Sequence, residues 1–257
     1  MKIRKREGFF YGILAAAVAI IGIRQILAGD VGHSVLCGVS LVLIFLPLLL
    51  QKYMKIYMPG PLAALLALSV FASAVLGEVE QYYLLYPHWD TILHGVDGFV
   101  TAALGFALMD VMNHNPAFHF VPFPKWVGLW VFCFSMTVGL IWEFIEFLCD
   151  WFLKTDMQKD ILRQKLSTIW FTGDTGTTTQ MIDIQQTVIT GYQDGKLTDW
   201  TISGGFLDIG LLDTMQDLLA CGAGALIFVV LLSGYLKTRQ MTPGQKNWIP
   251  KMRKNRK

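Results

Sequence analysis

Charged side chains are scarce in this sequence. Only 16% of the 257 residues are Asp, Glu, Lys or Arg, whereas 54% are hydrophobic. Soluble domains usually carry about a quarter charged residues, so the composition argues against an ordinary soluble domain. It indicates instead a multi-pass protein of the lipid bilayer.

The sequence also lacks the common signatures of soluble catalytic and redox sites. Its four cysteines are scattered and form no CxxC pair, so neither a disulfide framework nor a zinc finger is expected. No Walker loop, GxSxG or HExxH motif occurs. Any chemistry must therefore come from side chains that the fold brings together.

Six apolar segments approach the length of roughly 20 residues that crosses a bilayer. They are residues 9–28, 33–50, 61–77, 91–111, 125–149 and 211–236. Turn and charge signals separate them. We therefore expect an all-α membrane protein with transmembrane helices one to five in residues 1–149 and a sixth in 211–236.

Lys and Arg are distributed unequally between the connections. Fifteen of the 21 lie on one side of the expected membrane and five in loop 150–210, while Arg24 lies within the first span. The positive-inside rule then places both termini in the cytoplasm. The tail, residues 237–257, is predicted to be a basic cytoplasmic segment near anionic lipid rather than a nucleic-acid-binding arm.

Loop 150–210 is predicted to be extracytoplasmic and is too long for a simple connection. Asp194-Gly195 lies between runs rich in β-branched residues, which is a strong signal for a β-hairpin. We expect a small β-element here, between the fifth and sixth spans.

Carboxylates and one imidazole gather near the span ends that are predicted to face outward. Asp90, His94 and Asp97 project within about 60° of each other on the fourth span. The other candidates are Glu143 and Glu146 on the fifth span, and Asp213 and Asp217 on the sixth. Polar groups at span ends often face interfacial water, which is the reading we prefer for Glu78, Glu80 and Asp150, whereas ionisable groups within the membrane are functional candidates by default.

Carboxylates buried together need compensation for their charge. Three sources remain open: a divalent metal ion held by oxygens and the imidazole, a proton shared between carboxylates, or an ion pair with Arg24. The predicted metal ligands are His94, Asp97, Glu143, Glu146, Asp213 and Asp217. The predicted catalytic residues are Asp90, His94, Glu143 and Glu146.

The order of these motifs resembles a known pattern. "WDTILHGVDGF", "WEFIEF" and "LLDTMQDLLACGAGAL" are similar to the YjdF-like family of bacterial inner-membrane proteins and, more distantly, to VanZ-like proteins. The resemblance covers residues 75–235 and implies a bacterial plasma (inner) membrane location. By position it supports Asp90, His94, Glu143, Glu146, Asp213 and Asp217 as one unit. The insertion at residues 155–205 departs from the compact loop that the family pattern implies.

Three classes of function fit the sequence. The first is a membrane enzyme or binding protein for a lipid-linked or cell-envelope substrate, in which a carboxylate orients water beside a metal ion. The second is an ion or proton transporter, although the inner halves of the spans carry almost no ionisable residue. The third is a structural or accessory protein whose polar cluster only fixes helix packing.

Overall fold

The structure is a computed structural model that describes residues 5–54, 56–113, 124–171, 176–238 and 242–252. The chain divides into two compact units. The first consists of Met1–Ile141 and Asp217–Lys257, and the second of Trp142–Gln216.

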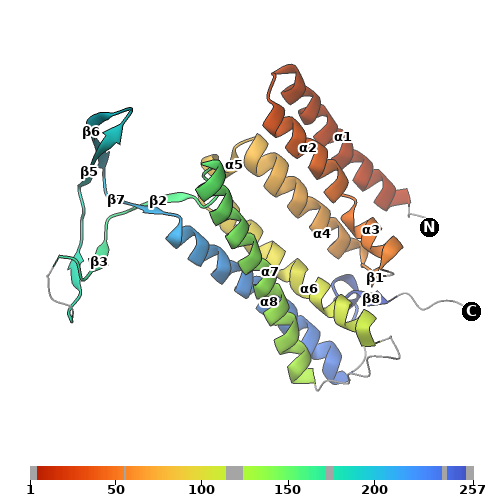
Figure 1. Cartoon of the computed structure of the whole chain (residues 1–257). Coiled ribbons are helices and arrows are strands. Elements are labelled where there is room, and N and C mark those ends of the chain that lie inside the picture. Colours follow the sequence, from red (N-terminus) through yellow and green to blue (C-terminus); the bar gives the residue numbers. More distant parts are fainter. Residues whose placement is uncertain (1–4, 55, 114–123, 172–175, 239–241, 253–257) are drawn as a thin grey trace, which may run out of the picture. The chain divides into compact units, whose positions relative to one another are not determined.

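Helices dominate the chain, as the composition predicts. Their bounds are α1 Lys5–Leu27, α2 Val31–Leu43, α3 Leu46–Tyr53, α4 Gly60–Val70, the π-helical segment η1 Phe71–Val79, α5 Tyr82–Leu85, α6 Trp89–Asn113, α7 Pro124–Leu153, α8 Leu211–Thr238 and the short 3₁₀ turn η2 Gln245–Asn247. Figure 1 shows α1 and α2 side by side, as their mutual contacts confirm.

Five helices among the described residues are long and apolar enough to cross a membrane. They are Gly8–Leu27, Gly60–Val79, Trp89–Asn113, Trp126–Leu153 and Leu211–Lys237. The second predicted span, residues 33–50, is a pair of helices, α2 and α3, bent by 42° at their junction. The described part of the chain therefore contains five candidate spans, or six if the bent pair is one span.

Pro47 accounts for the bend between α2 and α3. It occupies the first turn of α3, where its missing N–H is harmless, but a continuous helix would need that donor. The N–H of Ile44 still bonds the carbonyl of Ser40, and α2 ends there. A hydropathy pattern averages over such a break, so residues 33–50 look uniform in sequence.

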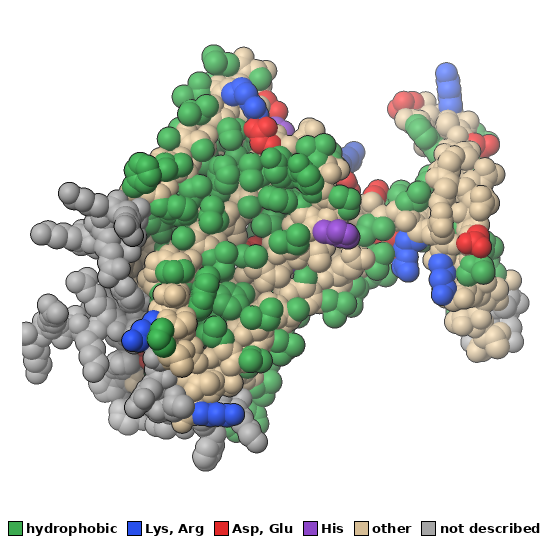
Figure 2. Space-filling view, turned by 180° about the vertical axis from the view of Figure 1, so that it is seen from behind, with side chains coloured by type: hydrophobic (Ala, Val, Ile, Leu, Met, Phe, Trp, Pro, Cys, Tyr) green, Lys and Arg blue, Asp and Glu red, His purple; other side chains and the backbone are tan. Residues whose placement is uncertain are grey.

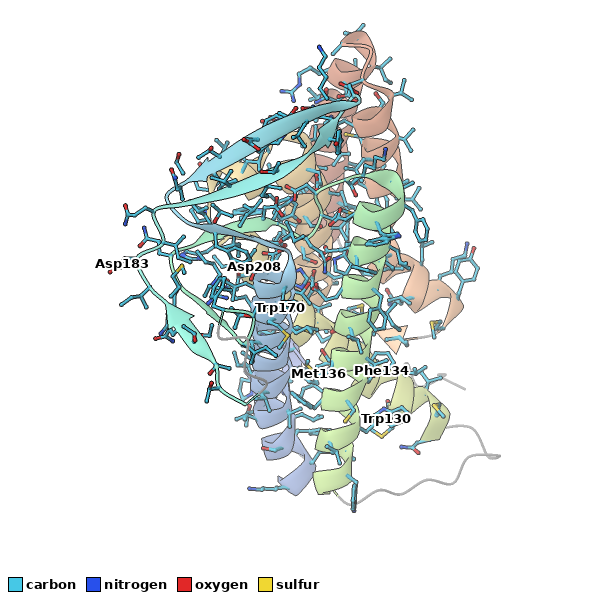
Figure 3. All side chains as sticks on the ribbon, turned by 60° about the vertical axis from the view of Figure 1, so that its left-hand side comes forward. Trp130, Phe134, Met136, Trp170, Asp183 and Asp208 are labelled. Carbon is cyan, nitrogen blue, oxygen red and sulfur yellow. The ribbon has the colours of Figure 1, made fainter. Side chains whose placement is uncertain are left out.

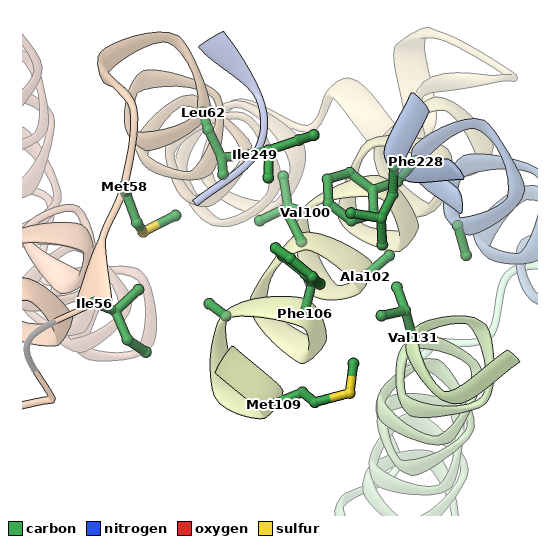
Figure 4. Close-up of a cluster of buried hydrophobic side chains, with 14 of the residues drawn as sticks. Ile56, Met58, Leu62, Val100, Ala102, Phe106, Met109, Val131, Phe228 and Ile249 are labelled. Atoms are coloured by element: carbon green, nitrogen blue, oxygen red, sulfur yellow. The ribbon is translucent and has the colours of Figure 1, made fainter. Parts of the chain in front are cut away.

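Two clusters of buried hydrophobic side chains hold the first unit together. One joins α4, α6 and α8 with the beginning of α7, and Figure 4 shows Leu62, Val100, Phe106 and Phe228 within it. The other joins α1, α2, α4 and η1. Hydrophobic side chains also cover much of the visible outer surface of the helices in Figure 2, as expected where lipid replaces water.

The segment after α8 returns to the helices. Ile249 is 1% exposed and belongs to the larger hydrophobic cluster. Strand β8, Lys251–Met252, pairs antiparallel with β1, Ile56–Tyr57, so that Ile56 lies opposite Met252. Trp248 and Ile249 thus pack against the helices, within the segment that the sequence predicts to be a basic tail. Residues 253–257, which carry most of its basic run, lie outside the described residues.

In the second unit, the described residues form three antiparallel strand pairs, some of whose strands are labelled in Figure 1. They are β2 Asp160–Arg163 with β7 Phe206–Ile209, β3 Leu166–Thr168 with β4 Thr179–Met181, and β5 Gln186–Gln193 with β6 Lys196–Ser203. The last pair is a hairpin whose two-residue turn is Asp194-Gly195, with φ of 50° and 77°. Positive φ at both positions is the type I′ geometry that the Asp-Gly signal predicts.

Candidate functional site

The beginning of α6 positions the first two candidate side chains. Asp90 lies in the first turn, where a carboxylate is favoured by the helix dipole, and His94 follows one turn later. The indole nitrogen of Trp89 donates a hydrogen bond to the carbonyl of Ala72 in η1 (3.1 Å). This bond fixes the start of α6 against the neighbouring segment and hence the direction of both side chains.

Helix α8 contributes the third side chain, Asp217. The two helices run parallel, because Gly98 meets Cys221 and, further along, Phe106 contacts Tyr235. A Cβ added at Gly98 would collide with the carbonyl of Cys221, so the glycine lets the two backbones touch. The first turns of α6 and the Asp217 region of α8 therefore lie at the same end of the helix pair.

Asp90, His94 and Asp217 form a compact group. Nε2 of His94 lies 3.4 Å from Oδ1 of Asp90 and 4.0 Å from Oδ2 of Asp217. One ligand atom from each residue lies within 4.8 Å of the other two. Asp217 is 1% exposed and His94 9%, so the group is largely shielded from solvent.

This donor set matches the chemistry of a divalent metal site. One imidazole nitrogen and two carboxylate oxygens suit Zn²⁺ and Mn²⁺. Ligand bonds of about 2.0–2.2 Å in a tetrahedron put neighbouring donor atoms roughly 3.3 Å apart. The His94–Asp90 separation already has that value, and small side-chain rotations would bring in Asp217. A protonated imidazole between the two carboxylates would equally complete an ion-pair network.

Asp97 has a different partner. It lies one turn beyond His94 on α6, and its carboxylate lies near Ser69 in α4, whose hydroxyl donates to the carbonyl of Leu66 (3.1 Å). The structure places Asp97 at the α4–α6 contact, outside the group of three. Its backbone carbonyl accepts from the hydroxyl of Thr101 (2.6 Å), which in turn lies 2.8 Å from the hydroxyl of Ser135.

Glu143, Glu146 and Asp213 belong to the second unit. Glu143 and Glu146 are buried and one turn apart on α7, and Oε1 of Glu146 accepts a hydrogen bond from the indole nitrogen of Trp142 (2.7 Å). Oδ2 of Asp213 accepts from the backbone N–H of Lys159 (2.7 Å). These bonds give Glu146 and Asp213 local structural partners.

Three residues that the sequence analysis left open or assigned to interfacial water have defined roles. Arg24 pairs with Glu80 at 2.6 Å, so its guanidinium neutralises that carboxylate. Asp150 accepts hydrogen bonds from the backbone N–H groups of Met157 and Gln158, and thereby shapes the exit of the chain from α7. Neither role follows from hydropathy.

Ser135 is a buried polar residue that the sequence analysis missed. Its hydroxyl donates to the carbonyl of Gly98 (2.8 Å) and is 0% exposed, so it ties α7 to α6. Nearby on α7, Phe134 packs over Gly105 and Met136 over Gly222, and both side chains are labelled in Figure 3. A single serine inside the apolar run "FCFSMTVG" was the available signal.

One family model matches most of the chain, over residues 8–238. Its description reads "Predicted membrane protein (DUF2238)". No curated protein and no solved structure matches the sequence.

Proposed function

The chain belongs to this family of predicted membrane proteins, and on that premise we propose that it holds a divalent metal ion at Asp90, His94 and Asp217. The ion would polarise a lipid-linked or envelope substrate beside the first turns of α6. The observation that supports this most directly is the convergence of three metal-ligating side chains from two helices, with ligand atoms within 4.8 Å.

Burial strengthens the case for an ion. Removing the carboxylates of Asp90 and Asp217 from water costs several kcal/mol of desolvation free energy per ion. A divalent ion supplies two positive charges at the point where the two carboxylates meet. It also acts as a Lewis acid and lowers the pKa of a bound water, which a membrane hydrolase or transferase needs.

Glu143 and Glu146 remain the residues that the sequence offers as a general base. Both are carboxylates, the type of side chain that takes a proton from water in general-base catalysis. Asp213 and Asp97 remain further ligand candidates from the sequence. To bind an ion, the Asp213 carboxylate would have to give up its hydrogen bond from the Lys159 N–H.

The proposal also specifies the side of the membrane that the site faces. With both termini in the cytoplasm, the beginnings of α6 and α8 face outward, and so does the second unit. The site would then act on substrates of the outer leaflet or the envelope of a bacterial plasma membrane.

A metal titration tests the proposal. Purified protein in detergent is melted with increasing Zn²⁺ or Mn²⁺, beside His94→Ala and Asp217→Asn. The wild type should gain RT ln(1 + [L]/Kd), about 2.7 kcal/mol at 100-fold saturation, and both variants should lose most of that gain. His88→Ala is the matched control, because His88 is exposed and lies just before α6.

If the three side chains form only an ion-pair network, the melting temperature should respond differently to metal. If Asp90, His94 and Asp217 only hold the helices together, added metal leaves the melting temperature unchanged. His94→Ala then lowers that temperature in chelator alone, because two buried carboxylates lose their partner. That pair of results would overturn the metal site.

A further inference from the structure

A long apolar groove begins beside the Asp90–His94–Asp217 group. It has a volume of about 600 Å³ and lies entirely within the first unit, between α4, α6 and α8. Its wall includes Leu65, Ile92, Phe99, Ala223, Ile227 and Trp248. Ala220, three residues after Asp217, and Gly95, next to His94, line the end of the groove that lies nearest to this group.

The floor of the groove is backbone. Gly95 and Gly224 let α6 and α8 touch, and a Cβ at Gly224 would collide with the carbonyl of Gly95. Ala220 and Ala223 add only methyl groups. Small side chains in this row leave a slot between the larger side chains of Ile92, Phe99 and Ile227.

The far end of the groove is closed by the returning C-terminal segment. The ring of Trp248 meets that of Phe99 edge to face, with centroids 5.6 Å apart. The side-chain amide of Gln245 donates to the carbonyl of Leu231 (3.0 Å), and buried Ile249 anchors the turn that follows α8. The groove therefore runs from the neighbourhood of His94 and Asp217 to Trp248, which sets its length.

That length fits one lipid chain. From Ala220 to Leu231 the helix rises roughly 16 Å at 1.5 Å per residue. Half of a hydrocarbon core about 30 Å thick is roughly 15 Å, the depth reached by an acyl chain of one leaflet. The apolar wall offers such a chain no unsatisfied polar group.

We propose that this groove binds a single acyl chain of a phosphate-bearing lipid, with the phosphate at Asp90, His94 and Asp217 and the methyl end at Trp248. The assignment rests on the proposed function for its head-group end, since two carboxylates attract a phosphate only through a bound cation. The chain itself is held by Ile92, Phe99, Ile227 and their neighbours. The substrate class is thus a lipid whose head group is processed while its tail stays in the bilayer.

Photolabelling tests the position and direction of the chain. The full-length protein is reconstituted with phosphatidylglycerol that carries a diazirine either near the carbonyl or near the methyl end of its acyl chain. We expect the first probe to label peptides around Ala220 and Ala223, and the second to label those around Leu231 and Trp248. Labels distributed evenly over all spans, without this order, would mean ordinary surrounding lipid and would overturn the proposal.

A groove-filling variant supplies the control. Ala223→Phe puts a phenyl ring in the slot, and labelling there should fall by about tenfold or more, as for the loss of at least ~1.4 kcal/mol. Ala16→Phe makes the same change at an exposed position on α1 and should leave the labelling intact. Unchanged labelling in Ala223→Phe overturns the proposal. So does a dimer crosslink in wild-type protein that Ala223→Phe removes, because a second copy would then fill the groove.

The two proposals fail separately. Labelling in the expected order without a metal-dependent melting temperature would support the acyl chain in the groove and reject the metal site. A metal-dependent melting temperature without ordered labelling would support the metal site and reject the acyl chain in the groove.

Discussion

Gly224 of α8 packs directly against the backbone carbonyl of Gly95 in α6. No side chain separates the two helices at this point, which lies within two turns of both His94 and Asp217. Helix association in membranes relies on such small-residue contacts, because lipid provides no hydrophobic drive between helices. The same contact that sets the distance between His94 and Asp217 forms the floor of the acyl groove.

Gly224→Ala should therefore destabilise the protein and disturb the site. The added methyl group would force the helices apart at a cost of about 1–3 kcal/mol. The measurements are thermal melting in detergent and metal affinity, both of which should fall. Gly12→Ala is the control: its Cβ would meet nothing within 4 Å, so helix propensity predicts a gain of about 0.5–1 kcal/mol. Equal effects of the two changes would contradict the close contact.

Ser135→Ala should weaken the contact between α6 and α7. The buried hydroxyl is bonded to the carbonyl of Gly98 and lies beside Thr101, and hydrogen bonds of this kind contribute about 0.6 kcal/mol in membranes. We expect a lower melting temperature and unchanged metal affinity. Ser233→Ala serves as control, because the exposed Ser233 hydroxyl bonds only a carbonyl of its own helix. A melt of Ser135→Ala that matches the wild type would show that the bond contributes nothing.

The charge asymmetry predicts the topology. A reporter fused after Lys257 should be active in its cytoplasmic form, and one inserted at Asp194-Gly195 should report the outside. The insertion point is a two-residue hairpin turn, so strands β5 and β6 can remain paired. If the Asp194 fusion reports cytoplasm, the beginnings of α6 and α8 face inward and the substrate must come from the inner leaflet.

Stability near β2 should depend on pH through Asp160. Partial desolvation, together with the charges of Asp156, Asp150 and Asp208, raises the pKa of its carboxyl group. A raised pKa in the folded state means that folding takes up a proton, so stability is gained as pH falls towards the folded-state pKa. Asp160→Asn should stabilise β2 and β7 at neutral pH, and the gain should shrink in mild acid.

Hydrogen exchange of the β2 and β7 amides at pH 7 and pH 5 checks this expectation in the full-length protein. Asp194→Asn is the matched control, since Asn is equally suited to the type I′ turn. If the exchange rates in Asp160→Asn depend on pH as they do in the wild type, another group causes the pH dependence.

Local sequence signals predicted much of the fold. Long apolar runs mark α1, α6, α7 and α8 because the bilayer imposes length and hydropathy on each helix separately. Asp194-Gly195 predicted its hairpin because the turn geometry depends on those two residues alone. The bend at Pro47 was missed because a span was judged by average hydropathy over 33–50.

The candidate site was only partly accessible to sequence reasoning. Asp90 and His94 share a face by helical spacing, and the span order puts α6 and α8 in the same direction. The rotation of each helix about its axis is set by tertiary contacts such as that of Gly98 with Cys221, which no local pattern encodes. Asp97 therefore meets Ser69 of α4, although its spacing alone groups it with His94.

The pairing of β1 with β8 has a consequence for biosynthesis. Ile56 lies opposite Met252, so this strand pair cannot form until Met252 has left the ribosome. Strand β1, between α3 and α4, therefore has no partner strand while α6, α7 and α8 are inserted one after another. The contact is the most distant in sequence of the strand pairs described here, and contacts of this kind are slow to form. Residues translated after α8 thus close the groove wall at Trp248, and a nascent chain that stops after α8 lacks that wall.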